Sequence, residues 1–195
     1  MGRIFIVMGK SATGKDTIYK KLLEYDELKL KTAVMYTTRP IRNSEQNGEE
    51  YFFVDEEELH RLQKENKIIE HRTYETIHGP WHYFTVNDGQ IKLEESNYLM
   101  IGTLETYTQI KEYFGADKVV PVYLEIEDGI RLSRALKREL KQEEPKYAEM
   151  CRRFLADDED FSEDNLQKCG ITKRYQNLDI NICLYEVKEA IKNLL

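Results

Sequence analysis

The residues with the clearest chemistry in this sequence are two glycines and a lysine near its start. Gly9 and Gly14 bound a short loop that Lys15 follows directly, and their spacing is the Gly-x-x-x-x-Gly-Lys pattern of loops that hold phosphates. An apolar strand is expected before the loop and a helix after it. Backbone N–H groups of the loop and of the helix N-terminus then converge on one anion site, and Lys15 reaches the outer phosphates. The candidate phosphate-binding residues are Gly9, Lys10, Ser11, Ala12, Thr13, Gly14, Lys15, Asp16 and Thr17.

One position of the loop departs from this pattern. The residue after Lys15 is normally a Ser or Thr that meets a magnesium ion, but here it is Asp16, and Thr17 follows one place later. Asp16 and Thr17 are therefore the candidate magnesium ligands. The plainer interpretation is an ordinary connection between a strand and a helix, with Lys15 in solvent.

A second group of anion-binding side chains lies in Thr37-Thr38-Arg39-Pro40-Ile41-Arg42 and at Tyr51. Two guanidinium groups from one turn can hold a phosphate through charge-assisted hydrogen bonds, and a tyrosine hydroxyl can complete the shell. Exposed arginines on loops are common, so Arg39 and Arg42 alone do not define a site. In a chain that also carries a phosphate-binding loop, they become a candidate second phosphate site.

The composition narrows the class of protein. A chain of 195 residues is long enough for one domain with a substantial core. The formal net charge of -7 argues against a nucleic-acid-binding protein, because such proteins carry a basic face. Three cysteines without a Cys-x-x-Cys pair suit a reduced, cytoplasmic protein better than a secreted one. Neither a signal peptide nor a membrane-spanning apolar run is expected, so we predict a cytoplasmic protein with no membrane partner.

The elements that must position these residues alternate along most of the chain. Strands are expected at 3–8, 98–101, 119–126 and 171–175, and helices at 17–23, 105–114, 129–142, 147–156 and 181–195. This order indicates an α/β domain with a parallel sheet. Pro145 separates two of the helices, and this pair can form a mobile flap. The acidic run at 157–160 is expected to be a solvated face.

The stretch between the first helix and residue 95 has a different character. Short strands are expected at 31–36, 51–54, 67–75 and 81–86, with helices at 55–64 and 88–95 and a turn at Gly79-Pro80. Pro40 prevents the first of these strands from continuing. The mostly antiparallel pattern of the middle part indicates a small lobe inserted between strands of the parallel sheet.

The sequence resembles the guanylate kinase family over nearly its whole length, most strongly in residues 3–85. The motifs that carry this resemblance are the loop at 9–17, the string Thr37-Thr38-Arg39-x-x-Arg42-x-x-Glu45-x-x-Gly48-x-x-Tyr51-Phe52-Phe53-Val54, and Ile68-Ile69-Glu70. The resemblance implies a three-layer α/β P-loop fold with a parallel five-stranded sheet, an inserted, mostly β lobe for a nucleoside monophosphate, and a helical flap. We therefore expect a single domain with its core at 1–36 and 86–195, the lobe at about 37–85 and the flap at about 138–158. The implied reaction is ATP + GMP giving ADP + GDP, with Mg²⁺.

The resemblance also implies which residues meet the acceptor, GMP. Arg39, Arg42 and Tyr51 would hold its phosphate. Glu70 would accept hydrogen bonds from the N–H donors of guanine. The remaining acceptor residues implied by the resemblance are Tyr83 and Thr85.

For the donor, ATP, the resemblance implies a second set of residues. Lys15 would hold the transferred phosphoryl group, and Asn177 would meet adenine. Arg138 and Arg153 would close over the ATP phosphates. The neighbouring flap arginines, Arg134 and Arg152, are the alternatives. All four arginines could instead simply form a charged, solvent-exposed helix face with no role in binding.

Two departures from the family pattern concern base recognition. The family's Asp-x-Asp motif is missing after the strand at 98–101, where the chain reads Ile101-Gly102-Thr103. Met35 stands where the family often has a serine that contacts the base. Guanine recognition would then depend mainly on Glu70 and Thr85, and the loss of hydrogen-bond partners puts base selectivity in question.

Three functions follow from these observations. The first is a nucleoside monophosphate kinase that uses ATP and GMP. The second is a kinase for another phosphorylated acceptor, because Asp16 and Gly102-Thr103 are also similar to the ribose 1,5-bisphosphate phosphokinases. The third is a binding module without catalysis, which the missing aspartates favour and the intact loop with Lys15 opposes. The sequence does not predict the oligomeric state.

Overall fold

The structure is a computed structural model that describes residues 1–42, 45–76 and 79–195. Its strands are β1 (Ile4–Met8), β2 (Leu30–Lys31), β3 (Tyr36–Thr37), β4 (Phe52–Phe53), β5 (Ile68–Thr76), β6 (Gly79–Val86), β7 (Asn97–Ile101), β8 (Val119–Glu125) and β9 (Arg174–Gln176). Its helices are α1 (Lys15–Leu23), the 3₁₀ helix η1 (Asp26–Leu28), α2 (Glu56–Lys64), α3 (Leu104–Phe114), α4 (Asp128–Glu139), α5 (Tyr147–Asp160), α6 (Glu163–Lys168) and α7 (Ile180–Lys192). In the described parts of the chain, no helix is long and apolar enough to cross a membrane.

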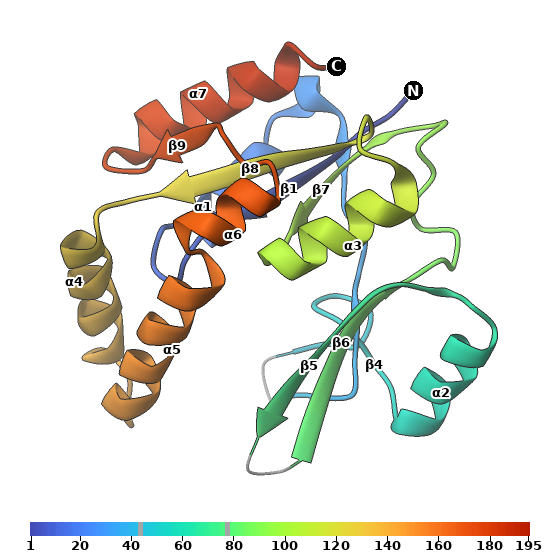
Figure 1. The fold of residues 1–195 in the computed structure, drawn as a ribbon, viewed down its shortest axis with the longest axis horizontal. Helices are drawn as coiled ribbons and strands as arrows, with labels where there is room; N and C mark the ends of the chain where they lie inside the picture. The colour runs from blue at the N-terminus through green and yellow to red at the C-terminus, as the bar shows by residue number, and fades with distance from the viewer. Residues whose placement is uncertain (43–44, 77–78) are drawn as a thin grey trace.

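A five-stranded parallel sheet, in the order β2-β7-β1-β8-β9, forms the middle layer of the core (Figure 1). Every residue of β1 is buried, and its side chains alternate between the two faces of the sheet. Ile4 and Ile6 pack with side chains of α3 and α6, whereas Phe5 and Val7 pack with those of α1 and α7. Helices therefore cover both faces, and the predicted three-layer α/β fold is confirmed.

The second sheet, in the order β4-β3-β6-β5, forms a lobe beside the core (Figure 1). β6 is antiparallel to both β3 and β5, whereas β3 and β4 are parallel. The Asp55 side chain caps α2, which packs Leu59 and Leu62 on this sheet. Gln109 of α3 joins the core to the lobe, because its side chain bonds both the N–H and the C=O of His71 in β5. The predicted lobe of mostly antiparallel strands is present.

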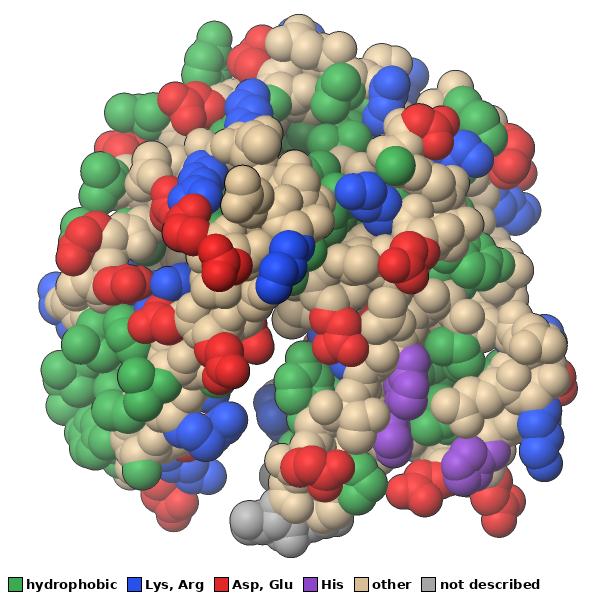
Figure 2. All heavy atoms as spheres, in the orientation of Figure 1, with side chains coloured by type: hydrophobic (Ala, Val, Ile, Leu, Met, Phe, Trp, Pro, Cys, Tyr) green, Lys and Arg blue, Asp and Glu red, His purple; other side chains and the backbone are tan. Residues whose placement is uncertain are grey.

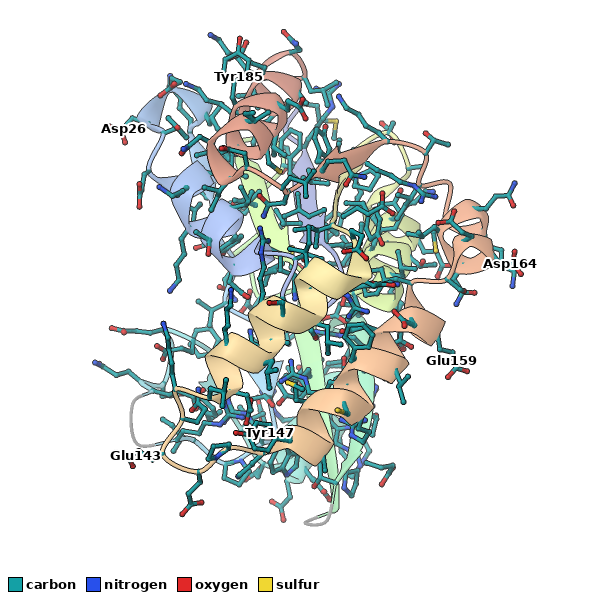
Figure 3. All side chains as sticks on the ribbon, turned by 90° about the vertical axis from the view of Figure 1, so that its left-hand side faces the viewer. Asp26, Glu143, Tyr147, Glu159, Asp164 and Tyr185 are labelled. Carbon is teal, nitrogen blue, oxygen red and sulfur yellow. The ribbon has the colours of Figure 1, made fainter. Side chains whose placement is uncertain are left out.

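α4 and α5 pack on each other and form an arm on the other side of the molecule from the lobe sheet (Figure 1). The Arg131 guanidinium of α4 lies 3.6 Å from the ring centre of Phe154 in α5. Glu143 and Tyr147 lie at the free end of the arm, while Glu159 lies toward the core (Figure 3). The arm includes the segment predicted to be a flap, and α5 continues through the acidic residues at 157–160.

Residues 31–36 and 88–95 do not form the predicted strand and helix. Leu30–Lys31 joins the parallel sheet and Tyr36–Thr37 joins the lobe, so the expected strand is divided between the two sheets. Between them, the N–H and C=O of Val34 bond to the Gln90 side chain. Asp88 Oδ1 accepts the Gln90 N–H, a local bond that competes with helix formation.

The predicted turn at Gly79-Pro80 is also wrong, because both residues belong to β6. They pair with Thr76 and Glu75 of β5. The paired residues of β3 lie opposite Tyr83 and Phe84, so β6 at Pro80 extends beyond β3. A proline is tolerated at such a position because its missing N–H breaks no bond to a second neighbour.

Candidate active site

The loop between β1 and α1, the candidate phosphate-binding loop, depends on two glycines for its backbone shape. Gly14 has φ +94° and Gly9 has φ +153°. A Cβ atom on Gly14 would lie 2.4 Å from Asn177 Nδ2, and one on Gly9 would lie 2.5 Å from the Leu124 carbonyl oxygen. Both positions therefore require glycine. α1 begins directly after the loop, so the free N–H groups of its first turn lie at the same place.

Asn177 supports the loop from the C-terminal part of the chain. It is buried, and its Nδ2 donates to the Thr13 carbonyl oxygen at 2.7 Å. Its Oδ1 is buried without a hydrogen-bond partner among the residues that the structure describes. A pocket of about 340 Å³ lies here, and its lining includes Gly14, Asp16, Thr17, Arg138 and Asn177. The structure therefore brings the candidate magnesium ligands and the predicted adenine residue to one pocket.

Lys15 is half-buried near charges from the flap. Burial lowers the pKa of Lys15 from its ordinary value, Asp16 and Asp157 oppose this shift, and Arg153 and Arg138 add to it. Of the two flap arginines favoured by sequence, Arg138 lines the pocket that Asp16 and Thr17 also line. Of the alternatives, Arg152 pairs with Glu149 at the surface. Arg134 lines the same pocket as Arg138, and its Nη2 donates to the Asn177 carbonyl oxygen.

Loop, lobe and flap meet at one cavity of about 820 Å³. Ser11 of the loop, Arg42 of the lobe, and Arg138 and Arg153 of the arm all line it. Figure 2 shows the hollow between the arm and the lobe, with Lys and Arg side chains on its wall. Cations from separate segments therefore face one space, whose size is typical of sites for small ligands. The arm also contributes four carboxylates to its lining, from Glu139, Glu143, Glu144 and Glu149.

The acidic run at the end of α5 is only in part the solvated face that the sequence predicted, because Glu159 and Asp160 are exposed whereas Asp157 and Asp158 are half-buried and bonded. Asp157 Oδ2 accepts the Ser11 N–H at 2.8 Å and a bond from Arg131 Nη1 at 3.2 Å. Asp158 Oδ1 accepts bonds from Lys10 Nζ and Arg131 Nη2, both at 2.7 Å. Arg131 is fully buried, so it needs these carboxylates to compensate its charge. The arm is therefore hydrogen-bonded to the candidate phosphate-binding loop. The Ser11 N–H of this loop already donates to the Asp157 carboxylate.

In the lobe, Arg39 is buried and held in one orientation. Its guanidinium makes two hydrogen bonds of 2.9 and 2.8 Å to Glu45 and lies 5.6 Å from the ring centre of Tyr51. The hydrogen bonds to Glu45 raise the pKa of Arg39. The Tyr83 ring packs edge-on against Tyr51, with their centres 5.6 Å apart. Arg39, Tyr51 and Tyr83 thus form one polar and aromatic cluster.

Glu70 and Thr85 lie opposite each other on β5 and β6. Both are buried, and Thr85 Oγ1 donates to Glu70 Oε1 at 2.9 Å. Arg72 Nε donates to Glu70 Oε2 at 3.0 Å. Burial raises the pKa of Glu70, while Arg72 and Thr85 act in the opposite direction. The carboxylate predicted to face the base is therefore already paired with a cation.

The structure sorts the predicted residues into groups and adds others that sequence reasoning missed. Four predicted residues share the large cavity, three form the lobe cluster, and Glu70 with Thr85 forms a separate buried pair. The missed residues are Glu45, Arg72, Arg131, Asp157 and Asp158. Glu45 stands in the lobe motif, and Arg72 is two residues from Glu70 on a strand, so both had a local signal. Asp157 had none, because its partner Ser11 is 146 residues away.

Comparison with known proteins identifies the family. The family model described as guanylate kinase matches residues 1–147. Guanylate kinase from Porphyromonas gingivalis is 32% identical over 126 residues, which are 64% of this chain and 65% of that protein. Guanylate kinase from Malacoplasma penetrans is 30% identical over 142 residues, which are 72% of this chain and 68% of that protein.

The matched segments span just under two thirds of the Porphyromonas protein and slightly more of the Malacoplasma protein. A crystal structure of guanylate kinase from Anaplasma phagocytophilum superposes with a TM-score of 0.63, covering 98% of this chain and 85% of that one. Its sequence identity is 21%, so this likeness shows the fold alone. Together, the fold, the loop and the family match over residues 1–147 show that the chain belongs to the guanylate kinase family.

Proposed function

We propose that this protein transfers the γ-phosphoryl group of ATP to GMP, forming ADP and GDP. The observation that supports this most is the cavity of about 820 Å³, where Ser11 of the loop, Arg42 and the arm residues Arg138 and Arg153 meet. Phosphoryl transfer requires little covalent work from a protein, so positioning and charge neutralisation supply the acceleration. Membership of the guanylate kinase family favours GMP as the acceptor.

ATP is proposed to place its phosphates on the loop and its adenine beside Asn177. The loop fits this role, because Gly9 and Gly14, with φ +153° and +94°, adopt backbone conformations that residues with a side chain rarely adopt. The buried Asn177 Oδ1 offers an acceptor for the amino group of adenine. Lys15, with its charge near Arg138, would neutralise the transferred phosphoryl group.

Asp16 and Thr17 are the residues proposed to hold magnesium. Both are exposed at the start of α1 and line the pocket beside the loop. Carboxylate and hydroxyl oxygens are the hard ligands that Mg²⁺ prefers, so the donor set fits the ion. When bound, the ion would neutralise phosphate charge. Replacing Asp16 with Ser should change the magnesium dependence of the reaction, and an unchanged dependence would remove Asp16 from this role.

The acceptor is proposed to lie against the lobe. Arg39, Arg42, Tyr51 and Tyr83 would hold its phosphate, because guanidinium groups and phenolic hydroxyls bind phosphate oxygens through charge-assisted hydrogen bonds. The buried pair of Glu70 and Thr85 lies on strands of the same sheet and is proposed to mark the base end of the site.

We further propose the division of the chain into a core at 1–36 and 86–195, a lobe at about 37–85 and a flap at about 138–158. Closure of lobe and flap over the cavity would exclude water, which otherwise accepts the phosphoryl group. The mechanism requires no general base. Cys151, Cys169 and Cys183 are all free thiols, which suits the reduced cytoplasm that we propose as the working compartment.

The test is release of ADP from ATP in the presence of GMP, dGMP, AMP, UMP or ribose 1,5-bisphosphate. We expect the highest kcat/KM with GMP, and no turnover by the Lys15→Met variant. Turnover with ribose 1,5-bisphosphate alone would assign the protein to a different acceptor. Binding of nucleotides without any ADP release would make it a binding module.

A further inference from the structure

Arg72 is the less deeply buried member of a buried ion pair in the proposed acceptor lobe. Glu70 and Arg72 share a face of β5, because residues two apart in a strand point the same way. Arg72 Nε and Thr85 Oγ1 each donate to one oxygen of Glu70, at 3.0 and 2.9 Å. The Glu70 side chain is 0% exposed, whereas that of Arg72 is 8% exposed. A ligand on this face therefore meets a guanidinium before it meets a carboxylate.

The guanidinium of Arg72 has hydrogen-bonding capacity beyond this pair. Its Nη2 lies 3.7 Å from the Met35 sulfur, and a thioether is a weak acceptor. Burial by itself would lower the pKa of Arg72, but Glu70 and Tyr74 raise it above its ordinary value. Arg72 therefore keeps its charge, and a charged, planar group of this kind is a strong donor to ligand oxygen and nitrogen acceptors.

We propose that Arg72 determines the base specificity of the acceptor site by donating hydrogen bonds to the O6 and N7 edge of a purine, and that Glu70 positions it. This inference rests on the proposed function. A guanidinium matches the two acceptors O6 and N7 of guanine, whereas adenine presents an amino donor at position 6. Because Glu70 already accepts hydrogen bonds from Arg72 and Thr85, it forms only a weak hydrogen bond with the 2-amino group of guanine. The acceptor class is therefore the 6-oxopurine nucleoside monophosphates, GMP and IMP alike.

The experiment measures kcat/KM for GMP, IMP and AMP in the wild-type protein and in three variants. Arg72→Ala removes the donor, and Arg72→Lys keeps the positive charge but loses the planar fork. Arg61→Ala is the matched control, since Arg61 lies on α2 of the same lobe and pairs on the surface with Glu58 and Glu65.

We expect wild type to use GMP and IMP within about tenfold of each other and to prefer both to AMP. Arg72→Ala should reduce the preference for GMP over AMP by about 5- to 150-fold, the usual value of a two-point contact to a base. Arg72→Lys should reduce it in part, and Arg61→Ala should leave it unchanged.

Removal of Arg72 leaves Glu70 buried without its cation, so thermal unfolding of each variant is measured as well. If Arg72→Ala does not fold, the inference is tested by whether Arg72→Lys loses part of the preference for GMP over AMP. An unchanged GMP-to-AMP preference in a folded Arg72 variant would overturn the inference, and so would a wild-type preference for GMP over IMP of about 100-fold or more. Wild-type protein that phosphorylates none of the three would instead overturn the proposed function, and this inference with it.

Discussion

Replacing Asp157 with asparagine is expected to tighten the binding of ATP. Asp157 Oδ2 accepts the N–H of Ser11 at 2.8 Å, so a carboxylate stands at the loop where the ATP phosphates are proposed to bind. Asparagine has nearly the same shape and can still accept this hydrogen bond through its Oδ1, but it carries no charge. The variant therefore weakens the group that competes with the ATP phosphates for the Ser11 N–H, without removing the side chain.

The magnitude follows from the kind of bond that is weakened. A hydrogen bond to a charged group contributes about 1.5–3 kcal/mol, against about 0.5–1.5 kcal/mol for a neutral one. Loss of the charge should thus favour ATP by about 1–2 kcal/mol, or about 5- to 30-fold in Kd. Arg131 keeps Asp158 and Asp128 as partners, so we expect stability to fall by only about 1 kcal/mol, or about 2–4 °C in Tm.

The assay is calorimetric titration with a non-hydrolysable ATP analogue and magnesium, and with GMP as the second ligand. The analogue should bind more tightly to Asp157→Asn, while the Kd for GMP stays the same. Asp164→Asn is the control, because it removes an exposed carboxylate from the neighbouring helix α6. Unchanged analogue binding would refute competition at the loop, and weaker binding that depends on magnesium would show that Asp157 serves the ion.

Three further predictions concern the loop and the lobe. Gly14→Ala should lower the free energy of unfolding by about 1–3 kcal/mol and weaken ATP binding, because φ at this position is +94° and the new Cβ would lie 2.4 Å from Asn177 Nδ2. Chemical denaturation measures the stability and titration measures ATP binding, and a fully stable variant would contradict this reasoning. Glu45→Gln should raise KM for GMP about tenfold with little change in KM for ATP, since Arg39 loses the charged partner of its two hydrogen bonds. Equal changes in both KM values would argue against a role of Arg39 in binding the acceptor. Burial lowers the pKa of Lys15, so between that pKa and 10.5 the unfolded chain binds more protons than the native one. The free energy of unfolding should therefore gain a contribution from Lys15 as pH rises through this interval, while activity falls; denaturation curves of Lys15→Met should lack that gain.

The parts of the fold that sequence predicted are those with local causes. The loop was recognisable because Gly9, Gly14 and Lys15 are close in sequence and their spacing follows from backbone geometry. The alternation of apolar strands and amphipathic helices was sufficient to predict the parallel sheet. Pro80 was read as part of a turn because its local signal is strong, but the pairing of β6 with β5 alone at that point accommodates it.

The residues that sequence reasoning missed depend on contacts between distant segments. Asp157 and Asp158 lie in an acidic run that reads as a solvated surface, and only the fold brings them to Lys10 and Ser11. The local Asp88 turn likewise replaces a helix, because the side chain of Gln90 is needed to hold Val34. Such outcomes depend on tertiary packing, which propensity and periodicity do not encode.

The most direct test of the central claim, that the loop and Arg42 of the lobe face one space, is the binding of a bisubstrate analogue. In this analogue, a chain of five phosphates joins the 5′ position of adenosine to the 5′ position of guanosine. We predict that one analogue binds per chain and displaces both ATP and GMP, and that Lys15→Met and Arg42→Ala each weaken it. An analogue that displaces only one of the two nucleotides would show that the sites do not face each other, and the proposed transfer would be contradicted.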